Sequence, residues 1–403
     1  MPDYKDTVAE LAVLGAESLF SVPKSTSNLV RPDLQNFLNY SKIFFEQQQY
    51  TNDGPLVRLL EQRLARFHQT EFCISFCNGF WGIALAMKVL ARKGKTEVIM
   101  PSFTYRRMAD IAAWAGLKPH FCEVEENTLA LSARTVAECI NDNTALILGV
   151  HPIVNCCDVE GLVELAKERE LPLLFDAVES VYEAVPGGKI GSFGDAECFS
   201  LHASKLLNGF EGGYITTNNA ALAKQLAAIR GFGFEGQDRV TMPHGLNAKL
   251  NEVHAAMALA GLDDLERQVA RNRQTYHLYQ RLLAETPGVR LLEFKEDHQT
   301  SYKNIVIELL ETWPLSRAAT LKILNAERVL ARAYYAPPLH RKKMAYPYVP
   351  ANLPLTDRLS GRFVLMPCGS LVEDHDIRKI VELMNFIHAN AGLIDDRLQE
   401  REV

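Results

Sequence analysis

Between residues 70 and 217, short apolar runs alternate with segments of helical periodicity. The pattern predicts strands at residues 71–76, 96–101, 118–125, 145–150, 171–177, 196–202 and 212–218, and helices at residues 80–94, 104–116, 159–171 and 220–230. Strands that are almost uniformly apolar and are joined through helices form a mostly parallel sheet, because both of its faces must be covered. The alternation therefore predicts the α/β class, with a large domain built on a mostly parallel central sheet.

A second domain is predicted after this region. Residues 251–285 form a long helical stretch, which we interpret as a connection between two domains. Beyond it, strands at residues 289–294, 301–310 and 362–367 and helices at residues 315–327 and 374–389 predict a smaller α+β domain. We expect an N-terminal extension over residues 1–30, a large domain over 31–265 and a small C-terminal domain over 266–403.

The composition argues against several classes of partner. The net charge is −6, from 43 basic and 49 acidic residues, which gives no general attraction to nucleic acid or to an anionic membrane surface. No run reaches the ~18 consecutive apolar residues of a membrane span, and the N-terminus lacks the basic and apolar segments of a signal peptide. The eight cysteines are too sparse for a disulfide framework and show no zinc-site spacing. We expect a cytoplasmic protein that binds no metal.

Two residues with complementary chemistry follow neighbouring strands. Asp176 ends the apolar run LPLLFDA, at the strand end where ligands bind in open α/β sheets. A buried acid needs a cationic partner, and a protonated pyridine nitrogen is one. Lys205 follows the strand AECFSLH, and a lysine amine can form a Schiff base with an aldehyde. Taken alone, Asp176 could also cap a helix and Lys205 could be an exposed loop residue.

A phosphate site and a ring-stacking residue are predicted beside this pair. A strand runs through Asn78–Gly79 directly into a helix, whose N-terminal N–H groups favour an anion unless the segment is only a turn. Ser200 adds a hydroxyl group, and Tyr105 could stack on a planar ring, although such an aromatic residue is more often part of the core. Together with an aldehyde-binding amine and an acid for a ring nitrogen, these groups describe a site for pyridoxal 5′-phosphate.

A different cofactor is suggested by residues 231–236, which match the GxGxxG pattern of dinucleotide-binding proteins. The motif follows a predicted helix rather than a strand, and Pro243 comes soon after it where a helix should begin. This context is wrong for a dinucleotide site, so we do not expect one.

Several segments, in their order along the chain, resemble the DegT/StrS family of fold-type I pyridoxal-phosphate enzymes, the nucleotide-sugar aminotransferases. The matching segments span roughly residues 30 to 390 and include CNGFWGIALAMKVL, EVIMPSFTY, LLFDAVES, FSLHASKLLNGFEGG and GLNAKLNEVHAA. The run ERVLARAYYAPPLHR resembles the subset that makes 4-amino-4,6-dideoxy sugars on thymidine diphosphate. The resemblance implies amino transfer from L-glutamate to a nucleotide-linked keto-deoxysugar, expected to be dTDP-4-keto-6-deoxyhexose, by a homodimer with shared active sites.

The resemblance also implies roles for single residues near the reacting atoms. Lys205 would be the Schiff-base lysine and would move the proton during amino transfer. Asp176 would hold the pyridine nitrogen, and Tyr105 would stack on the cofactor ring. His202 would either point into the substrate cavity or brace its own loop.

For the cofactor phosphate, the resemblance implies a site built from two segments and a partner chain. Gly79, the backbone of Phe80 and the hydroxyl group of Ser200 would hold the phosphate. Asn247 matches a position that reaches the phosphate from the partner subunit, which would place the active sites at a dimer interface.

Three positions depart from the family pattern. Phe80 replaces Thr or Ser, Glu179 replaces Gln or His, and Ala333 replaces an arginine. Glu179 lies near the expected position of the cofactor's 3′-oxygen, where a carboxylate would repel a phenolate unless it is protonated or paired. Two alternatives stay open: another pyridoxal-phosphate reaction, such as sugar dehydration or a lyase reaction, and a non-catalytic cofactor-binding protein. Dehydratases of this family carry histidine where this chain has Lys205, which argues against that branch.

Overall fold

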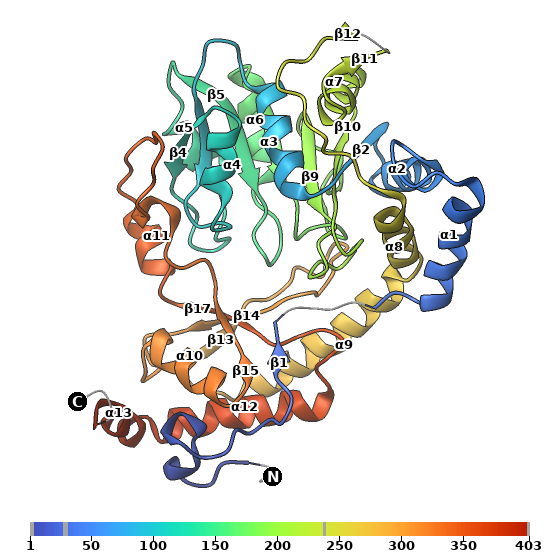
Figure 1. Ribbon diagram of the computed structural model, residues 1–403. Helices are drawn as coiled ribbons and strands as arrows, with labels where there is room; N and C mark the ends of the chain where they lie inside the picture. The colour runs from blue at the N-terminus through green and yellow to red at the C-terminus, as the bar shows by residue number, and fades with distance from the viewer. Residues whose placement is uncertain (1–3, 27–30, 237–238, 401–403) are drawn as a thin grey trace.

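The computed structural model describes residues 4–26, 31–236 and 239–400 of the 403-residue chain. Its large domain contains a seven-stranded sheet in the order β2-β10-β9-β6-β5-β3-β4 (Figure 1). The strands are β2 (Phe72–Phe76), β3 (Glu97–Pro101), β4 (Lys118–Cys122), β5 (Thr144–Val150), β6 (Leu173–Asp176), β9 (Ala196–Ser200) and β10 (Gly213–Thr217). Only β10 runs antiparallel to its neighbours within this sheet. The predicted α/β class with a mostly parallel sheet is confirmed.

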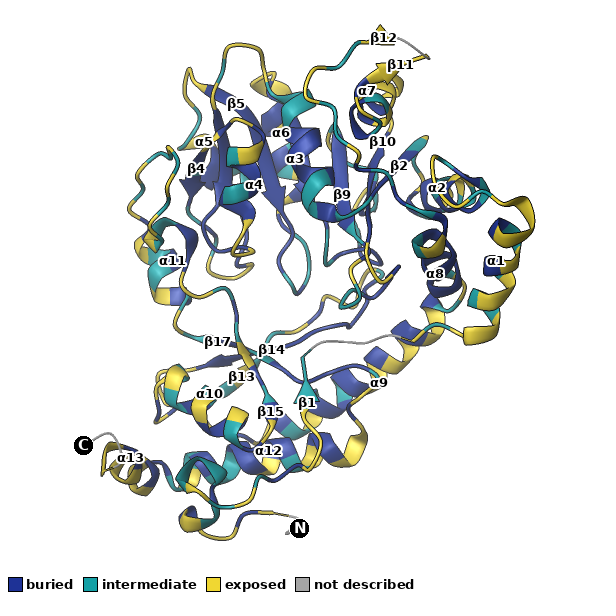
Figure 2. Cartoon of the chain, viewed as in Figure 1, coloured by how far each residue is buried: buried dark blue, intermediate teal, exposed yellow. Residues whose placement is uncertain are grey.

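Helices cover both faces of this sheet because its strands are buried on both sides, as every residue of β5 is. Helices α3, α4 and α7 pack into one core, and α2 and α6 pack into the other. In Figure 2 the buried sheet lies between helices whose outer faces are exposed. The helices of this domain are α1 (Leu34–Gln47), α2 (Pro55–His68), α3 (Gly79–Leu90), α4 (Met108–Trp114), α5 (Ala133–Ala137), α6 (Val159–Glu168), α7 (Ala220–Arg230) and α8 (Glu252–Asp263).

The connection to the second domain is two helices, so the prediction of one continuous helix over residues 251–285 is wrong. Helix α8 ends at Asp263, and α9 (Leu265–Leu283) begins after Asp264. The N–H group of Asp264 donates to the carbonyl of Gly261 at 3.2 Å, a tighter turn than an α-helix makes. The Asp264 carboxylate accepts hydrogen bonds from the side chains of Arg267 and Gln268, which satisfies it locally at the break.

The small domain contains a four-stranded sheet in the order β13-β14-β17-β16. Its strands are β13 (Val289–Leu291), β14 (Ile305–Leu309), β16 (Arg332–Ala333) and β17 (Phe363–Met366), and its helices are α10 (Arg317–Ala326), α12 (Asp374–Ala389) and α13 (Ala391–Glu400). The predicted strands and the two predicted helices are present. Strand β16 and helix α13 were not predicted, because two residues carry no readable strand period and α13 follows α12 almost without interruption.

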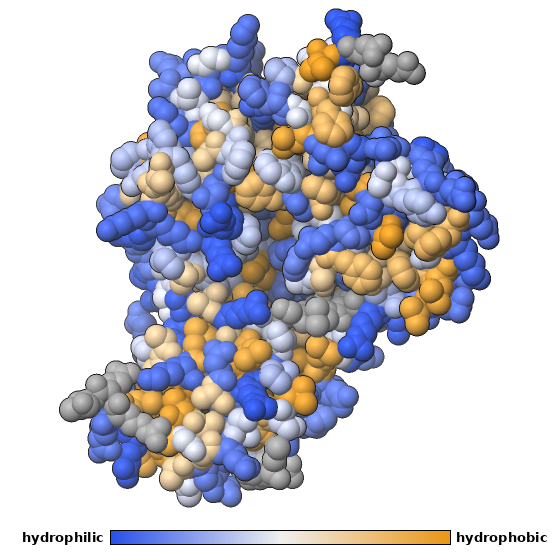
Figure 3. Space-filling model, viewed as in Figure 1, coloured by the Kyte–Doolittle hydropathy of each residue, from blue (hydrophilic) through white to orange (hydrophobic). Residues whose placement is uncertain are grey.

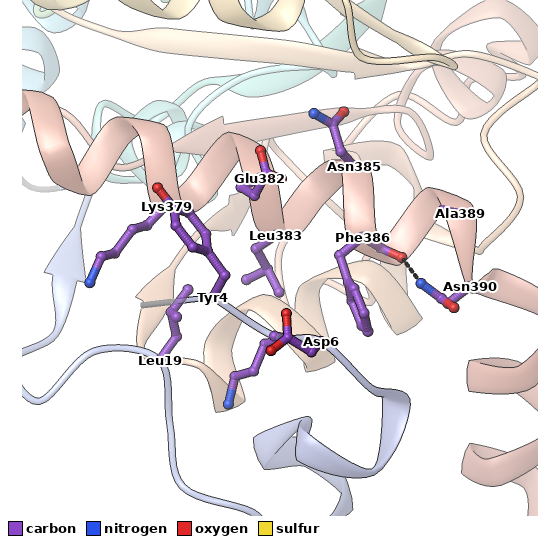
Figure 4. A pocket seen from close by; sticks show the side chains of 11 residues that line it. Tyr4, Asp6, Leu19, Lys379, Glu382, Leu383, Asn385, Phe386, Ala389 and Asn390 are labelled. Carbon is purple, nitrogen blue, oxygen red and sulfur yellow. Dashed lines mark hydrogen bonds between the residues drawn. The ribbon is translucent and has the colours of Figure 1, made fainter. Parts of the chain in front are cut away.

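The N-terminal segment packs on the small domain. Strand β1 (Lys24–Ser25) pairs in parallel with β15 (Val329–Leu330), and Lys5 Nζ lies 3.2 Å from the buried Glu327 carboxylate. A cavity of about 400 Å³ lies between this segment and α12 (Figure 4). The predicted end of the N-terminal extension falls within residues 27–30, outside the described residues.

The remaining elements are short and lie in connections. They are the 3₁₀ turns Val8–Glu10, Ala12–Leu14 and Leu339–Arg341, helix α11 (Pro354–Leu359), and the hairpins β7 (Ala184–Val185) with β8 (Gly188–Lys189) and β11 (Phe234–Glu235) with β12 (Arg239–Val240). Residues 231–236 lead from α7 into the β11–β12 hairpin, so no helix begins at the GxGxxG motif. In the described part of the chain, no helix has both the length and the apolar character needed to cross a bilayer.

Candidate active site

Asp176 lies at the carboxyl end of the parallel strands. It is the last residue of β6, in register with Val150 of β5 and Cys198 of β9, and is only 2% exposed. Its Oδ1 accepts a hydrogen bond from the N–H group of Val178 at 3.1 Å. Burial raises the pKa of Asp176 to about 6, although that hydrogen bond and the Lys205 charge oppose the shift. A carboxyl group in this environment strongly favours a cation placed against it.

Lys205 is carried by the loop after β9. Its backbone N–H group donates to the carbonyl of His202 at 2.9 Å, which closes the turn that carries it. Its Nζ forms a close ion pair with Oε1 of Glu179, and both side chains are 16% exposed. The charge of Lys205 lowers the pKa of Asp176, so the two residues singled out from the sequence lie near each other.

Glu179 has a second partner that was not predicted. Lys303, from the segment that leads into β14, places its Nζ 2.6 Å from Oε2 of Glu179 and is 5% exposed. Burial alone would raise the pKa of Glu179, but the ammonium groups of Lys205 and Lys303 lower it to about 2. The carboxylate is therefore ionised and paired on both oxygens. No pattern in the sequence marked Lys303, because its partner lies in the other domain.

The start of α3 and the end of β9 meet in a small cradle. The side chain of Asn78 caps the helix by accepting from the N–H group of Trp81 at 2.9 Å, and Asn78 O accepts from Gly82. This leaves the N–H groups of Gly79 and Phe80 as the first-turn donors available to an anion. A Cβ atom built on Gly79 would lie 3.3 Å from Cβ of Ser200, so the Ser200 hydroxyl lies beside these donors.

Tyr105 lies near a second tyrosine, Tyr335, which also lies near the two acids. Tyr105 follows β3 in an exposed loop. Burial raises the pKa of Tyr335, and smaller contributions come from Tyr334, Glu179, Asp176 and Tyr105. Tyr335 follows β16, so these interactions bring a residue of the small domain near Tyr105, Asp176 and Glu179. Tyr335 was not predicted as a site residue, although it stands in the YYAPPLHR run.

The side chains of two predicted site residues, His202 and Asn247, contact neighbouring residues of the chain. Nδ1 of His202 lies 2.8 Å from Oγ of Ser204, and its Nε2 lies 3.8 Å from Glu211, so both ring nitrogens contact residues of the surrounding loop. Asn247 is exposed, and its Oδ1 accepts a hydrogen bond from Lys249 at 2.7 Å. A role for Asn247 at an active site would therefore require another subunit.

The donor set fits pyridoxal phosphate. Asp176 is a buried acid that favours a cation, the start of α3 with Ser200 offers donors to a phosphate, and Lys205 offers an amine. The cradle is also built for close approach, since a Cβ atom on Gly213 would lie 2.5 Å from the nitrogen of Gly79. Only glycine lets β10 lie this close to the start of the helix.

A basic pocket of about 500 Å³ begins one residue beyond Tyr105. Four cations line it, namely Arg106, Arg107, Lys342 and Lys343. Its one acid, Asp110, is engaged by Arg107 at 3.1 Å and by the hydroxyl of Tyr346 at 3.0 Å. Burial lowers the pKa of Lys342, with smaller contributions from Arg106 and Arg107 that Asp110 opposes. The sequence signal for this pocket was the pair of basic runs TYRR and HRKK, which our sequence analysis did not use.

Comparison with known proteins gives consistent matches over most of the chain. The model of the DegT/DnrJ/EryC1/StrS aminotransferase family matches residues 34–385. A dTDP-4-amino-4,6-dideoxy-D-glucose transaminase of Shigella dysenteriae is 28% identical over 306 residues, which cover 76% of this chain and 83% of that protein. A GDP-perosamine synthase of Vibrio cholerae is 26% identical over 332 residues, which cover 81% of this chain and 89% of that protein.

Among solved structures, DesI crystallised in the presence of its TDP-sugar product is similar over its whole length. The two chains are 32% identical, the TM-score is 0.90, and the match covers 98% of this chain and 100% of DesI. The N-terminal segment and the small domain are thus included in the similarity.

Proposed function

The chain belongs to the DegT/DnrJ/EryC1/StrS aminotransferase family, and we propose that it transfers an amino group from L-glutamate to a nucleotide-linked keto-deoxysugar, with dTDP-4-keto-6-deoxyhexose as the expected acceptor. It is a pyridoxal-phosphate-dependent aminotransferase, as members of this family are. The names of the Shigella and Vibrio relatives support a nucleotide sugar as the acceptor. The proposal depends most on one observation, which is that the Lys205 charge acts on the buried Asp176, next to the strand whose last residue, Ser200, meets the start of α3.

We propose that residues of four segments hold pyridoxal phosphate. They are Gly79 and Phe80 at the start of α3, Tyr105 in the loop after β3, Asp176 and Glu179 at and after the end of β6, and Ser200 and Lys205 at and after the end of β9. When bound, this cofactor withdraws the electron pair left behind as a proton leaves the substrate carbon.

The chain's own residues would position the groups and move the proton. Asp176 keeps the ring nitrogen protonated, because a buried carboxylate favours a cation beside it. Lys205 would supply the amine that holds the aldehyde group of the cofactor, and its free amine would act as the base and acid that moves a proton between the substrate carbon and its neighbour. The same residues would serve both the amino donor and the sugar acceptor.

The basic pocket supports a nucleotide diphosphate on the acceptor. Arg106 and Arg107 directly follow Tyr105, so the pocket lies beside the residue that would stack on the cofactor. A diphosphate would supply negative charge to a pocket in which four cations face one acid, and charge-assisted hydrogen bonds to phosphate are the strong kind. We place the diphosphate of the substrate here and the keto sugar toward Lys205.

A homodimer with shared sites is part of the proposal. Exposed apolar side chains gather over α1 on the right of Figure 3, where Leu34 and Phe45 are 68% and 65% exposed. Tyr50 and Phe210 on neighbouring segments are also exposed. Large exposed apolar surfaces of this kind mark protein interfaces. The exposed Asn247 would then be free to reach the cofactor phosphate of the partner. A cytoplasmic location stays a prediction.

Spectroscopy on the loaded enzyme tests the function directly. Protein reconstituted with pyridoxal phosphate should show a visible absorption band, and Lys205→Ala should abolish it because the amine that binds the aldehyde is gone. Lys95→Ala, which changes a lysine just before β3, should leave the band intact. An unchanged band in Lys205→Ala would contradict the assignment.

Turnover then separates amino transfer from the two alternatives. L-Glutamate should change the band of the loaded enzyme and release 2-oxoglutarate without any sugar present. Loss of water from the sugar would instead indicate dehydration, and loss of ammonia from the amino acid would indicate a lyase reaction. A band that no amino donor changes would indicate a non-catalytic protein. The acceptor can be identified by mass spectrometry of the amino form against a panel of nucleotide-linked keto sugars.

A further inference from the structure

The ion pair between Lys303 and Glu179 joins the two domains at the proposed cofactor site. Lys303 is held in place by contacts of its own segment with the large domain. Ser301 donates from its N–H and hydroxyl groups to Glu183 at 3.0 and 2.7 Å, and the N–H group of Ala184 donates to the carbonyl of Gln299 at 2.9 Å. These contacts fix the backbone just before Lys303, which presents its side chain to Glu179.

Without Lys303, a single cation would face two acids around Glu179, which is unfavourable. Asp176 and Glu179 are two acids in one buried turn, and the charge of Glu179 adds to the raised pKa of Asp176. Lys205 is a single cation, and the proposed reaction requires its amine as a nucleophile and proton carrier rather than as a permanent counter-ion. The titratable groups that interact electrostatically with Glu179 are Lys205, Lys303, Asp176, Tyr334, Tyr335 and Cys368.

We propose that Lys303 is a positioning residue that acts through Glu179, as the permanent counter-ion that keeps this carboxylate ionised and paired when Lys205 is engaged with the cofactor. The inference rests on the proposed function, since it assumes that pyridoxal phosphate binds beside Asp176, Glu179 and Lys205. A Glu179–Lys303 pair is neutral as a unit, so it does not repel a phenolate oxygen as a lone carboxylate would. The pair therefore explains how this chain accommodates glutamate at position 179.

The test is a double-substitution cycle that measures the dissociation constant for pyridoxal phosphate between pH 5.5 and 8.5. Lys303→Met should weaken binding tenfold or more at pH 8.5, because Glu179 then faces the cofactor without its counter-ion. The loss should shrink toward pH 5.5, since burial raises the pKa of an unpaired Glu179 and lets it take up a proton. In the Glu179→Gln background, Lys303→Met should change the dissociation constant less than twofold at every pH.

Two further variants separate this role from a structural one. Lys303→Arg keeps the positive charge and should restore binding to within threefold of the unsubstituted chain. Lys5→Met removes a lysine of similar burial that pairs with Glu327 in the small domain, so it should lower stability without changing the dissociation constant. If Lys303→Met does not fold, Lys303→Arg and Glu179→Gln still carry the test, because both keep the site's cation.

Some results would overturn the inference while leaving the proposed function intact. If Lys303→Met weakens binding equally in both backgrounds, Lys303 contacts the cofactor itself or is only structural. A loss that does not depend on pH, or failure of Lys303→Arg to restore binding, would equally contradict a role through Glu179. By contrast, absence of a visible band from the unsubstituted protein loaded with pyridoxal phosphate would overturn the proposed function itself.

Discussion

Asp176 occupies a position that reduces folding stability and prepares the site for a cation. Its pKa of about 6 in the folded protein lies above the ordinary 3.8, because burial penalises the charged form. The folded state thus holds this proton more tightly than the unfolded state does. Between about pH 4 and 6 the free energy of unfolding therefore falls as pH rises, and about 3 kcal/mol is lost above that window.

Asp176→Asn should consequently have opposite effects on stability and on cofactor binding. Without cofactor, the variant should be about 1–3 kcal/mol more stable than the unsubstituted chain at pH 7.5, because no charge is buried. This gain should disappear near pH 4. Its affinity for pyridoxal phosphate should fall about a hundredfold or more, as expected from losing a buried charge partner. Urea unfolding at several pH values and cofactor titration measure the two effects, and a variant that is less stable at pH 7.5 would contradict the assigned burial cost.

At this scale, the sequence revealed residues whose position follows from local pattern. Asp176 and Lys205 stand directly after apolar strands, and the carboxyl ends of parallel strands meet at one edge of a sheet. Glu179 was also identified from the sequence, as a carboxylate that must be protonated or paired if it lies near the phenolate oxygen of the cofactor. Lys303 could not be, because it reaches Glu179 only after the small domain has docked and nothing in its own segment signals that contact.

The start of α3 and strand β10 act together as one element of the site. Asn78 caps the helix, and Gly213 lies against its first turn with no room for a side chain. Because the atoms nearest to Gly213 belong to the backbone of Asn78 and Gly79, they cannot move aside as a flexible side chain would. The position of the helix N–H groups therefore depends on the absence of a side chain on the neighbouring strand.

Gly213→Ala should displace the first turn of α3 and weaken the phosphate cradle. The added Cβ would lie 2.5 Å from the nitrogen of Gly79, so we expect a loss of about 1–3 kcal/mol in stability from overpacking and at least tenfold weaker binding of pyridoxal phosphate. Gly392→Ala in α13 is the matched control, because a Cβ there meets no atom within 4 Å. Thermal unfolding and cofactor titration would report both effects, and unchanged cofactor affinity in Gly213→Ala would exclude the cradle as described.

At the scale of elements, the sequence predicted helices and strands that have a regular hydrophobic period. It missed short strands that form only by pairing with a distant segment. The seven strands of the large sheet and helices α3, α4, α6 and α7 were predicted from alternating patterns, whereas α1, α2 and α5 were not predicted. The break at Asp264 interrupts a helical period that continues on both sides, so the pattern could not reveal it. Strand β1 exists only because Val329–Leu330 pairs with it, and two residues alone carry no strand signal.

At the scale of the molecule, the site is assembled from both domains. The large domain contributes the strand-end acids, Lys205 and the phosphate cradle, whereas the small domain contributes Lys303 and Tyr335. The basic pocket combines Arg106 and Arg107, from the loop after β3, with Lys342 and Lys343, whose neighbours Leu339 and Met344 pack into the core of the large domain. Seating of the small domain thus completes the proposed cofactor site, whereas the proposed diphosphate site lies on the large domain.

The basic pocket should determine the affinity for the nucleotide-linked acceptor and have no effect on the affinity for the amino donor. Lys343→Glu reverses one charge at the proposed diphosphate site and should raise KM for the nucleotide sugar tenfold or more, since each charged contact to phosphate contributes about 1.5–3 kcal/mol. The reaction with L-glutamate should keep its rate, because that substrate carries no diphosphate. The effect on KM should shrink as salt is added.

The control for this change is Lys93→Glu, which reverses an exposed charge beyond the other end of α3 from Gly79 and should leave KM for both substrates unchanged. Steady-state kinetics with each substrate varied in turn separates the two half-reactions. An equal loss in both would mean that the pocket supports the fold rather than the acceptor. An unchanged KM for the nucleotide sugar would move the diphosphate site elsewhere, because a doubly charged group bound among four cations must respond to reversal of one of them.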